Sequence, residues 1–307
     1  MGEVNTKGKG GFLAWMIILG VLAYSLGLSF FAYSWTPGPN YRNVTVDTTV
    51  NISGSTPTIL SVVMQNPITL NAGVERFITC NVSIRDYNGF ADLQVVNASL
   101  FHSTSTEGAA LDNNTRYVNT SCSPVSQSGI YANYSCGFAL EYHALNGTWN
   151  CTARVNDSLN LQSLNSNRTN ISALYALNIT PTLIDFGVID AGTYSNNISV
   201  NVTNIGNLNI NVSVLGYARN MSDGYAFVCD FGNYTIGMLK FAANLTASYQ
   251  QKQNLSSAYQ AIAGLRINKT TNTSYSFNET YWQFYAEPTQ VAFGNCTGYI
   301  VFQAQPS

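Results

Sequence analysis

One long apolar segment near the N-terminus differs from the rest of the chain. Residues 11–35 read GFLAWMIILGVLAYSLGLSFFAYSW, and no charged residue occurs between Lys9 and Arg42. A helix of this length extends about 37 Å at about 1.5 Å per residue, enough to cross a hydrocarbon core of about 30 Å. Lys7 precedes the segment together with Lys9, which favours a cytoplasmic N-terminus. The pattern predicts cytoplasmic residues 1–10, a transmembrane helix at 11–35 and an exterior remainder.

Two alternatives to an uncleaved signal anchor remain open at this segment. Ala32 and Ser34 form a small-x-small cleavage site, although the apolar run exceeds the roughly 7–15 residues usual in secretory signals. Cleavage after Gly10 would instead release a pilin-like subunit of an extracellular filament. Type IV pilins usually carry Glu at the fifth mature position, where this chain has Trp15. The uncleaved anchor is therefore the favoured interpretation.

After the anchor, apolar and polar residues alternate over short stretches. Residues 197–214, NISVNVTNIGNLNINVSV, alternate on both sides of Gly206-Asn207. This pattern predicts two antiparallel strands joined by a turn, with one buried face and one polar face. Residues 43–52 and 81–84 repeat it, whereas residues 239–262 are ambiguous between a short helix and a long loop. Many short strands with polar turns predict an all-β sandwich.

The polar positions of these strands are almost all uncharged. Charged residues make up 9% of the chain, against about 25% in typical soluble domains, and the formal net charge is -2. Such a chain has no basic surface for nucleic acid. Its polar residues are instead 36 Asn, 29 Ser and 28 Thr.

Many of these residues form Asn-x-Ser/Thr motifs, the acceptor sites for N-linked glycans. The chain has 24 of them, from Asn43 to Asn295, all beyond the predicted anchor and several times more frequent than chance placement would give. Their middle residue is mostly apolar, so on a strand the Asn and the Ser or Thr would share the wet face. We therefore predict an N-glycosylated exterior. The sites singled out are Asn43, Asn51, Asn81, Asn97, Asn201, Asn211, Asn244 and Asn278.

Six cysteines, an even number, follow the anchor and predict disulfides in an exported chain. A zinc site is disfavoured because no two cysteines stand two to four residues apart. The first four allow three connectivities. Strand-like contexts favour a bridge between two sheets from Cys80 to Cys151 and a hairpin bridge from Cys122 to Cys136. The remaining two residues, Cys229 and Cys296, form the third predicted pair.

The two groups of cysteines suggest two domains. We expect a linker or strand at residues 36–55, a first sandwich at 56–172 and a second at 173–307, each large enough for its own core. Residues 159–172, LNLQSLNSNRTNIS, resemble a linker but could supply the last strand of the first sandwich.

Little in the sequence supports catalysis. His102 and His143 are the only histidines, and neither has a recognisable spacing to a nucleophile. Asp112-Asn113-Asn114 offers oxygen ligands but lacks a calcium-loop pattern, so a simple loop is favoured. Asp86-Tyr87-Asn88-Gly89 is typical of a turn. The 19 Tyr and 15 Phe could form a sugar-binding strip, but core packing is the favoured interpretation. We expect no catalytic residue, cofactor or metal site.

Three segments carry a resemblance to known proteins. GTWNCTARVND at residues 147–157 resembles the late strand of immunoglobulin-like domains, with Trp149 at the usual place of a corner Tyr. Residues 184–214, from IDFGVIDAG to NINVSV, and residues 281–305, YWQFYAEPTQVAFGNCTGYIVFQAQ, resemble strands and a final hairpin of surface-exposed modules of this kind. Residues 56–307 with the anchor resemble archaeal membrane-anchored cell-surface proteins with immunoglobulin-like β-sandwich domains. The resemblance implies an envelope or adhesive role.

The predicted fold is therefore mainly β: an N-terminal transmembrane helix followed by two immunoglobulin-like β-sandwich domains. The predicted function is that of a single-pass, N-glycosylated protein of the cell membrane, with its C-terminal domains extracellular and a structural or adhesive role. Expected partners are the lipid bilayer through residues 11–35, N-linked glycans, and other surface proteins or copies of the chain. The alternatives are a filament subunit and a surface carbohydrate- or protein-binding module.

Overall fold

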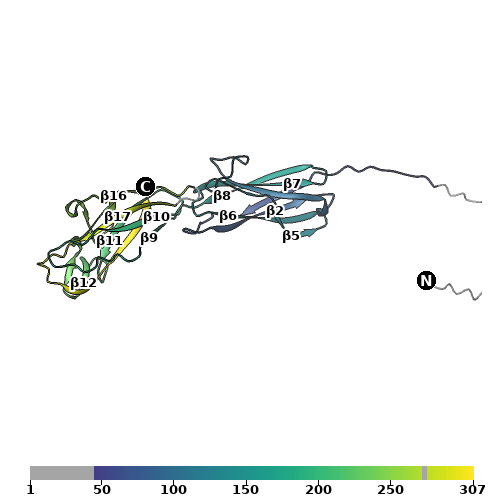
Figure 1. The fold of residues 1–307 in the computed structure, drawn as a ribbon. Helices are drawn as coiled ribbons and strands as arrows, with labels where there is room; N and C mark the ends of the chain where they lie inside the picture. Colours follow the sequence, from purple (N-terminus) through teal and green to yellow (C-terminus); the bar gives the residue numbers. More distant parts are fainter. Residues whose placement is uncertain (1–44, 272–274) are drawn as a thin grey trace, which may run out of the picture. The chain divides into compact units, whose positions relative to one another are not determined.

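The computed structural model describes residues 45–271 and 275–307 (Figure 1). The predicted cytoplasmic segment at 1–10 and the predicted transmembrane helix at 11–35 lie outside these residues. Within the described part of the chain, no helix has the length and apolar character needed to cross a bilayer.

The chain divides into two compact units, residues 1–52 and 53–307. The described end of the first unit, residues 45–52, has no regular secondary structure. Its large apolar side chains, Val46, Val50 and Ile52, are all exposed. The strand predicted at 43–52 is therefore wrong over residues 45–52. Alternation by itself does not make a strand, because the apolar side needs a neighbouring strand or a core to cover it.

Eight strands build the first part of the larger unit (Figure 1). They are β1 (Thr58–Met64), β2 (Arg76–Arg85), β3 (Leu93–His102), β4 (Arg116–Asn119), β5 (Ser123–Ser128), β6 (Tyr131–Leu140), β7 (Gly147–Asp157) and β8 (Gln162–Ile171). One sheet has the order β1-β2-β6-β5 and the other β4-β3-β7-β8, and every pairing is antiparallel. We call this part the first sandwich.

Alternation in the sequence creates the core of the first sandwich. In β2, Cys80, Val82 and Ile84 are buried while Asn81 between them is exposed, as the motif at 81–84 predicted. Strand β6 buries every second residue in the same way. The inner faces of the two sheets together form one continuous hydrophobic cluster that extends from Ile59 to Ile171.

Polar side chains close one side of this sandwich. The amide groups of Asn165 and Asn167 on β8 donate hydrogen bonds to the carbonyls of Ile59 and Val62 on β1, at 3.2 and 2.8 Å. The hydroxyl of Thr169 donates to the carbonyl of Gln65 at 2.6 Å. The linker-like residues 159–172 thus contain the last strand, and their polar residues join the two sheets.

The strand motif around Trp149 forms a corner contact. Trp149 lies on β7 and is fully buried, and its Nε1 donates to the carbonyl of Leu145 at 2.7 Å. His102 and Tyr117 pack against its ring, with centroids 5.6 and 6.0 Å away. This hydrogen bond ties Trp149 to the chain four residues upstream.

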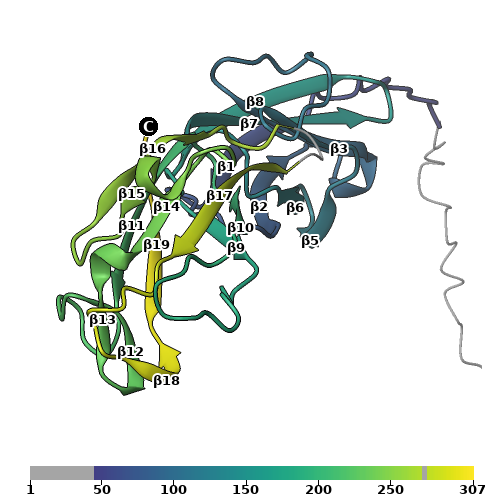
Figure 2. The same ribbon diagram turned by 60° about the vertical axis from the view of Figure 1, so that its left-hand side comes forward.

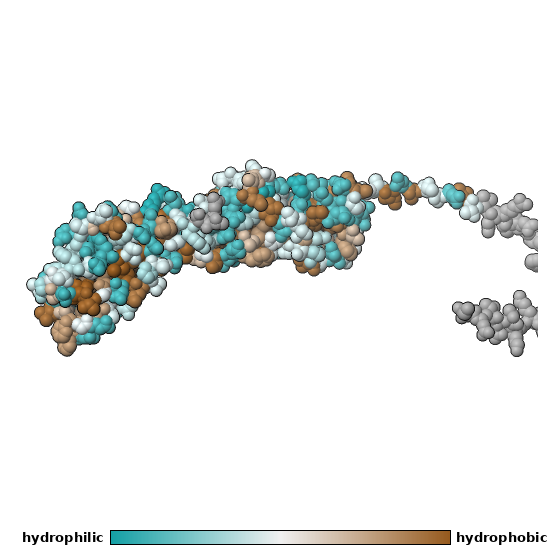
Figure 3. Space-filling model, viewed as in Figure 1, coloured by the Kyte–Doolittle hydropathy of each residue, from teal (hydrophilic) through white to brown (hydrophobic). Residues whose placement is uncertain are grey.

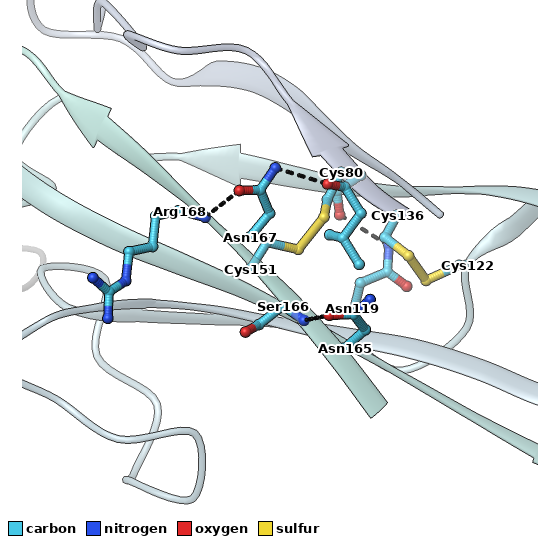
Figure 4. Close-up of a disulfide and its surroundings, with 11 residues drawn as sticks. Cys80, Asn119, Cys122, Cys136, Cys151, Asn165, Ser166, Asn167 and Arg168 are labelled. Atoms are coloured by element: carbon cyan, nitrogen blue, oxygen red, sulfur yellow. Dashed lines mark hydrogen bonds between the residues drawn. A yellow bond between two sulfur atoms is a disulfide. The ribbon is translucent and has the colours of Figure 1, made fainter. Parts of the chain in front are cut away.

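Three disulfides occur among the described cysteines, and they are the predicted pairs. Cys80 on β2 and Cys151 on β7 belong to different sheets, so their bond crosses the core of the first sandwich (Figure 4). Cys136 lies directly opposite Cys80 in the β2–β6 register and bonds to Cys122, which follows β4. The third bond joins Cys229 to Cys296.

The remaining strands surround a second hydrophobic cluster, which we call the second core (Figure 2). They are β9 (Leu177–Thr180), β10 (Ile198–Asn204), β11 (Ile210–Tyr217), β12 (Tyr225–Phe231), β13 (Asn233–Thr235), β14 (Leu239–Ala242), β15 (Gln253–Asn254), β16 (Gln260–Ile267), β17 (Ser276–Phe284), β18 (Phe293–Thr297) and β19 (Tyr299–Pro306). Their three sheets have the orders β15-β14-β17-β10-β9, β16-β11-β19 and β13-β12-β18.

The predicted hairpin at 197–214 is wrong in its pairing, although both strands exist. Strand β10 pairs with β17 and β9, whereas β11 pairs with β16 and β19 in another sheet. Valines of both strands enter the second core, so the chain crosses from one sheet to the other. The connecting Asn207 is fully buried and bonds to the backbone of Leu174 and Ser172, at 2.7 and 3.0 Å.

The final segment also differs from the expected hairpin. Strands β17, β18 and β19 lie in three different sheets. Residues 239–262 contain no α-helix: they hold β14, β15, the start of β16 and a short 3-10 turn at Tyr249–Gln251. The residues described are mainly β, as predicted. Both cores lie within the unit 53–307, so the division into 56–172 and 173–307 stays a prediction.

Candidate functional site

The acceptor asparagines are distributed unlike the other asparagines. Of the 24 motifs, 22 begin in the described residues, and none of those 22 asparagines is buried. Fourteen are exposed and eight are half-buried. Ten further asparagines in the described residues do not begin a motif, and three of them, Asn114, Asn204 and Asn207, are buried. Asparagine burial in this fold is therefore confined to positions that could not accept a glycan.

The buried asparagines have structural roles that explain the difference. The amide of Asn204 donates to the carbonyls of Leu208 and Asn268, at 2.7 and 3.0 Å, and its Oδ1 accepts from the backbone of Gly206. Buried amides of this kind must be saturated with hydrogen bonds, since an unpaired one costs about 1–3 kcal/mol. A glycan would displace these bonds.

The eight asparagines singled out from the sequence fall into three groups. Four are exposed: Asn51, Asn81, Asn244 and Asn278. Three are half-buried: Asn97, Asn201 and Asn211. Asn43 lies outside the described residues. Strand alternation explains why Asn81, Asn97, Asn201, Asn211 and Asn278 are not buried, but not why some of them are more accessible than others.

Asn201 and Asn211 illustrate the half-buried group. Asn201 lies on β10 between β17 and β9, and its Oδ1 is buried without a hydrogen-bond partner. The motif of Asn211 ends at Ser213, which is 2% exposed on β11, a strand that pairs with β16 and β19. By contrast, Asn244 lies in the turn after β14, with an exposed side chain. The motif alone does not distinguish a central strand from a turn.

The two histidines are both buried. His102 ends β3, and its ring nitrogens bond to Thr104 Oγ1 and the Asn146 carbonyl at 2.8 and 3.2 Å. His143 is 3% exposed, and neither ring nitrogen has a hydrogen-bond partner. Burial lowers the pKa of both imidazoles. They are structural residues of the first sandwich.

The predicted turns occur, with one difference in burial. Asp112 accepts hydrogen bonds from the backbone of Asn114 and the hydroxyl of Thr115, as a loop residue does. Asp86 begins a turn in which Gly89 N donates to its carbonyl at 3.0 Å. Its side chain, however, is 1% exposed. The turn motif did not indicate this burial.

Two apolar surface features lie on the strands that surround the second core. A groove of about 400 Å³ lies between β9, the loop at 181–186 and β19, with Ile179, Phe227 and Phe302 among its lining residues. Phe231 on β12 and Phe293 on β18 are both exposed and stack with ring centroids 4.6 Å apart. Figure 3 shows hydrophobic residues gathered at the end of the second core where β12 lies. Exposed apolar groups of this kind often mark contact surfaces.

Comparisons with known proteins give little further information. No family model matches the chain, and no curated protein matches it. Solved structures give only weak likenesses. The secreted serine protease VesC from Vibrio cholerae is 9% identical, with a TM-score of 0.21, over 81% of this chain and 51% of that one, so this chain spans about half of its length.

Two further structures are adhesins. A structure described as a chaperone-tip adhesin complex of CFA/I fimbriae biogenesis is 13% identical, with a TM-score of 0.29, over 82% of this chain and 84% of that one. The CupB6 tip adhesin from Pseudomonas aeruginosa is 7% identical, with a TM-score of 0.26, over 82% of this chain and 91% of that one. TM-scores this low do not establish a shared fold, so none of these likenesses supports a function.

Proposed function

We propose that this chain is a membrane-anchored, N-glycosylated protein of the cell surface with a structural or adhesive role. The observation that carries the proposal is the distribution of asparagines. None of the 22 acceptor asparagines in the described residues is buried, while every buried asparagine there lies outside a motif. Three disulfides also support it, because such bonds persist in oxidising compartments outside the cytosol.

The first sandwich fits an immunoglobulin-like domain. Its orders β1-β2-β6-β5 and β4-β3-β7-β8 correspond to the A-B-E-D and C′-C-F-G sheets of that fold. Cys80 and Cys151 then lie on strands B and F, which carry the inter-sheet disulfide of antibody domains. The second core has three sheets rather than two, so the same assignment does not extend to it. We propose one immunoglobulin-like domain followed by a different β domain.

In this role the protein would act by spacing, shielding and contact. The exposed pair of Phe231 and Phe293 is a suitable contact point for other surface proteins or copies of the chain. Glycans on the accessible strands would cover much of the remaining surface. Lipid contact would be made by residues 11–35.

Lysine labelling tests the orientation with controls inside the same chain. An impermeant amine reagent applied to intact cells is expected to modify Lys240, which is half-buried on β14, and to leave Lys7 and Lys9 unmodified until the cells are broken. Lys252, which is 4% exposed, should stay unmodified while the protein is folded. Peptide mass spectrometry reads out all four positions. Modification of Lys240 only after lysis would contradict the proposal.

A further inference from the structure

Three carboxylates from separate segments meet at one end of the first sandwich. Asp86 directly follows β2, Asp92 ends the 3-10 turn Phe90–Asp92, and Asp157 is the last residue of β7. Each offers one carboxylate oxygen, and these three oxygens lie within 4.8 Å of one another. Two oxygens bound to the same Ca²⁺ at about 2.3–2.6 Å are at most about 5 Å apart. The spacing therefore matches a shared cation.

Two of these carboxylates contain a buried oxygen without a partner. Asp86 and Asp157 are each 1% exposed. Their Oδ1 atoms accept backbone hydrogen bonds, from Asn88 at 2.9 Å in Asp86 and from Leu159 and Leu161 at 2.9 and 2.7 Å in Asp157. Their Oδ2 atoms are buried and accept none. A buried carboxylate oxygen without a proton donor or a cation is strongly unfavourable, which favours a cation at this position.

Among the described residues, no basic side chain forms an ion pair with these carboxylates. Within residues 45–271 and 275–307, the one ion pair is Arg154 with Glu107, which includes none of the three. Arg85 is adjacent in sequence, but its guanidinium lies over the Tyr87 ring, 4.8 Å from the centroid. A bound cation would balance the charge of these carboxylates.

The backbone holds the three segments together without a ligand. Gly89 adopts a φ of 98° in the turn after Asp86, a conformation that favours glycine. Its carbonyl accepts the backbone N–H of Asp92 at 3.1 Å. Ser158 donates its own N–H to the Asp92 carbonyl at 2.9 Å, which ties the β7–β8 loop to the β2–β3 loop. The ligands are thus positioned before any ion binds.

We propose that Asp86, Asp92 and Asp157 form a Ca²⁺ site at this end of the first sandwich. Ca²⁺ accepts six to eight oxygen ligands in flexible geometry, so three carboxylates with water at the half-buried Asp92 suit it. Mg²⁺ fits less well, because it demands a tighter octahedron and usually binds through one or two carboxylates. Extracellular modules bind Ca²⁺ with dissociation constants of about 10⁻⁴–10⁻³ M, which suits an exported protein.

The turn that follows Asp86 also contacts the segment that precedes β1. The backbone N–H of Ser55 donates to Asn88 Oδ1 at 2.6 Å, and the N–H of Asn88 donates to Asp86. Ca²⁺ bound at Asp86 would therefore fix the turn against which residues 53–55 rest. This inference is independent of glycosylation and of the membrane anchor.

Thermal unfolding and calorimetry of the full-length chain in mild detergent test the proposal. After treatment with chelator, addition of CaCl₂ to about 10 mM, ten times the upper end of that range, should raise the Tm of the first sandwich. MgCl₂ at the same concentration should raise it less. Isothermal titration calorimetry with Ca²⁺ should give one site per chain. No change in Tm and no binding heat would overturn the proposal.

Matched variants locate the site. Asp157→Asn keeps the side-chain shape and the Oδ1 acceptor but removes the charge, and it should weaken Ca²⁺ binding at least tenfold. Asp92 is half-buried, so the Asp92→Asn variant tests the same site with less risk to folding. Asp185→Asn is the control, because Asp185 is exposed and accepts from Gly187 in a similar turn. Wild-type Ca²⁺ affinity in both Asp157→Asn and Asp92→Asn would contradict the assignment.

Discussion

Replacement of both Cys80 and Cys151 by alanine is expected to lower the free energy of unfolding of the first sandwich by about 4 kcal/mol. The bond closes a loop between residues 71 apart in sequence, and the chain-entropy model gives about this value for a loop of that length. Both residues are fully buried in different sheets, so their loss also leaves space in the core. Urea titration with pulsed hydrogen–deuterium exchange would report the strands β2 and β7 separately from the second core.

The neighbouring bond supplies the control. Cys122 and Cys136 are only 14 residues apart, so their joint replacement by alanine should cost about 3 kcal/mol. Neither double variant should shift the unfolding of strands β10 and β17. An equal loss of stability in both cores would show that they unfold as one unit, and would contradict this expectation.

Trp149→Ala is expected to destabilise the first sandwich by about 3–5 kcal/mol, the usual cost of removing a large buried aromatic side chain. Trp149 is fully buried, and its Nε1 hydrogen bond to Leu145 is lost together with the ring. Trp149→Phe keeps most of the volume but leaves the Leu145 carbonyl without its donor, so a cost of about 1–3 kcal/mol is expected. Urea titration with pulsed hydrogen–deuterium exchange measures the loss of stability in both variants.

An exposed residue of the same sandwich serves as the comparison. Leu164 on β8 is exposed, and Leu164→Ala should change the free energy of unfolding by no more than about 0.5 kcal/mol. If Trp149→Phe were as stable as the wild type, the corner hydrogen bond would have no energetic role.

Local patterns predicted much of the first sandwich. Alternation at 81–84 and around Cys151 identified strands and their inward residues, and the inward cysteines then indicated the disulfide between sheets. These features depend on side chains a few residues apart, which the sequence displays directly. The mainly β character follows from the same alternation.

Pairing between strands was not predictable in the same way. Gly206-Asn207 is typical of a hairpin turn, yet the chain crosses there between two sheets, and Asn207 bonds to Ser172 and Leu174. An apolar face looks the same in sequence whether its neighbour is beside it in the sheet or opposite it in the core. The strand expected at 43–52 failed for a related reason, since residues 45–52 have no partner strand in the described structure.

The acidic cluster was not predicted at all, and no metal site was expected. Asp86, Asp92 and Asp157 come together only through the β2–β3 and β7–β8 loops, so no local motif marks them. The best clue in the sequence is that each lies at or near the end of a strand. The fold places these ends together.

The low charge content now has a structural counterpart. With charged residues at 9% of the chain, neutral Asn, Ser and Thr cover the exposed strand positions. We propose that glycans complete this covering, and the proposal makes a graded prediction. Accessible asparagines such as Asn81 and Asn244 should carry glycans at high occupancy. Asn201 should carry little, because its side chain is half-buried between β17 and β9.

Intact glycopeptide mass spectrometry of the protein isolated from its native cell envelope tests this claim most directly. The predicted result is glycan mass on the peptides containing Asn81 and Asn244, with much lower occupancy at Asn201. Unmodified peptides at all the exposed acceptor asparagines would contradict it, and the neutral surface would then need another explanation.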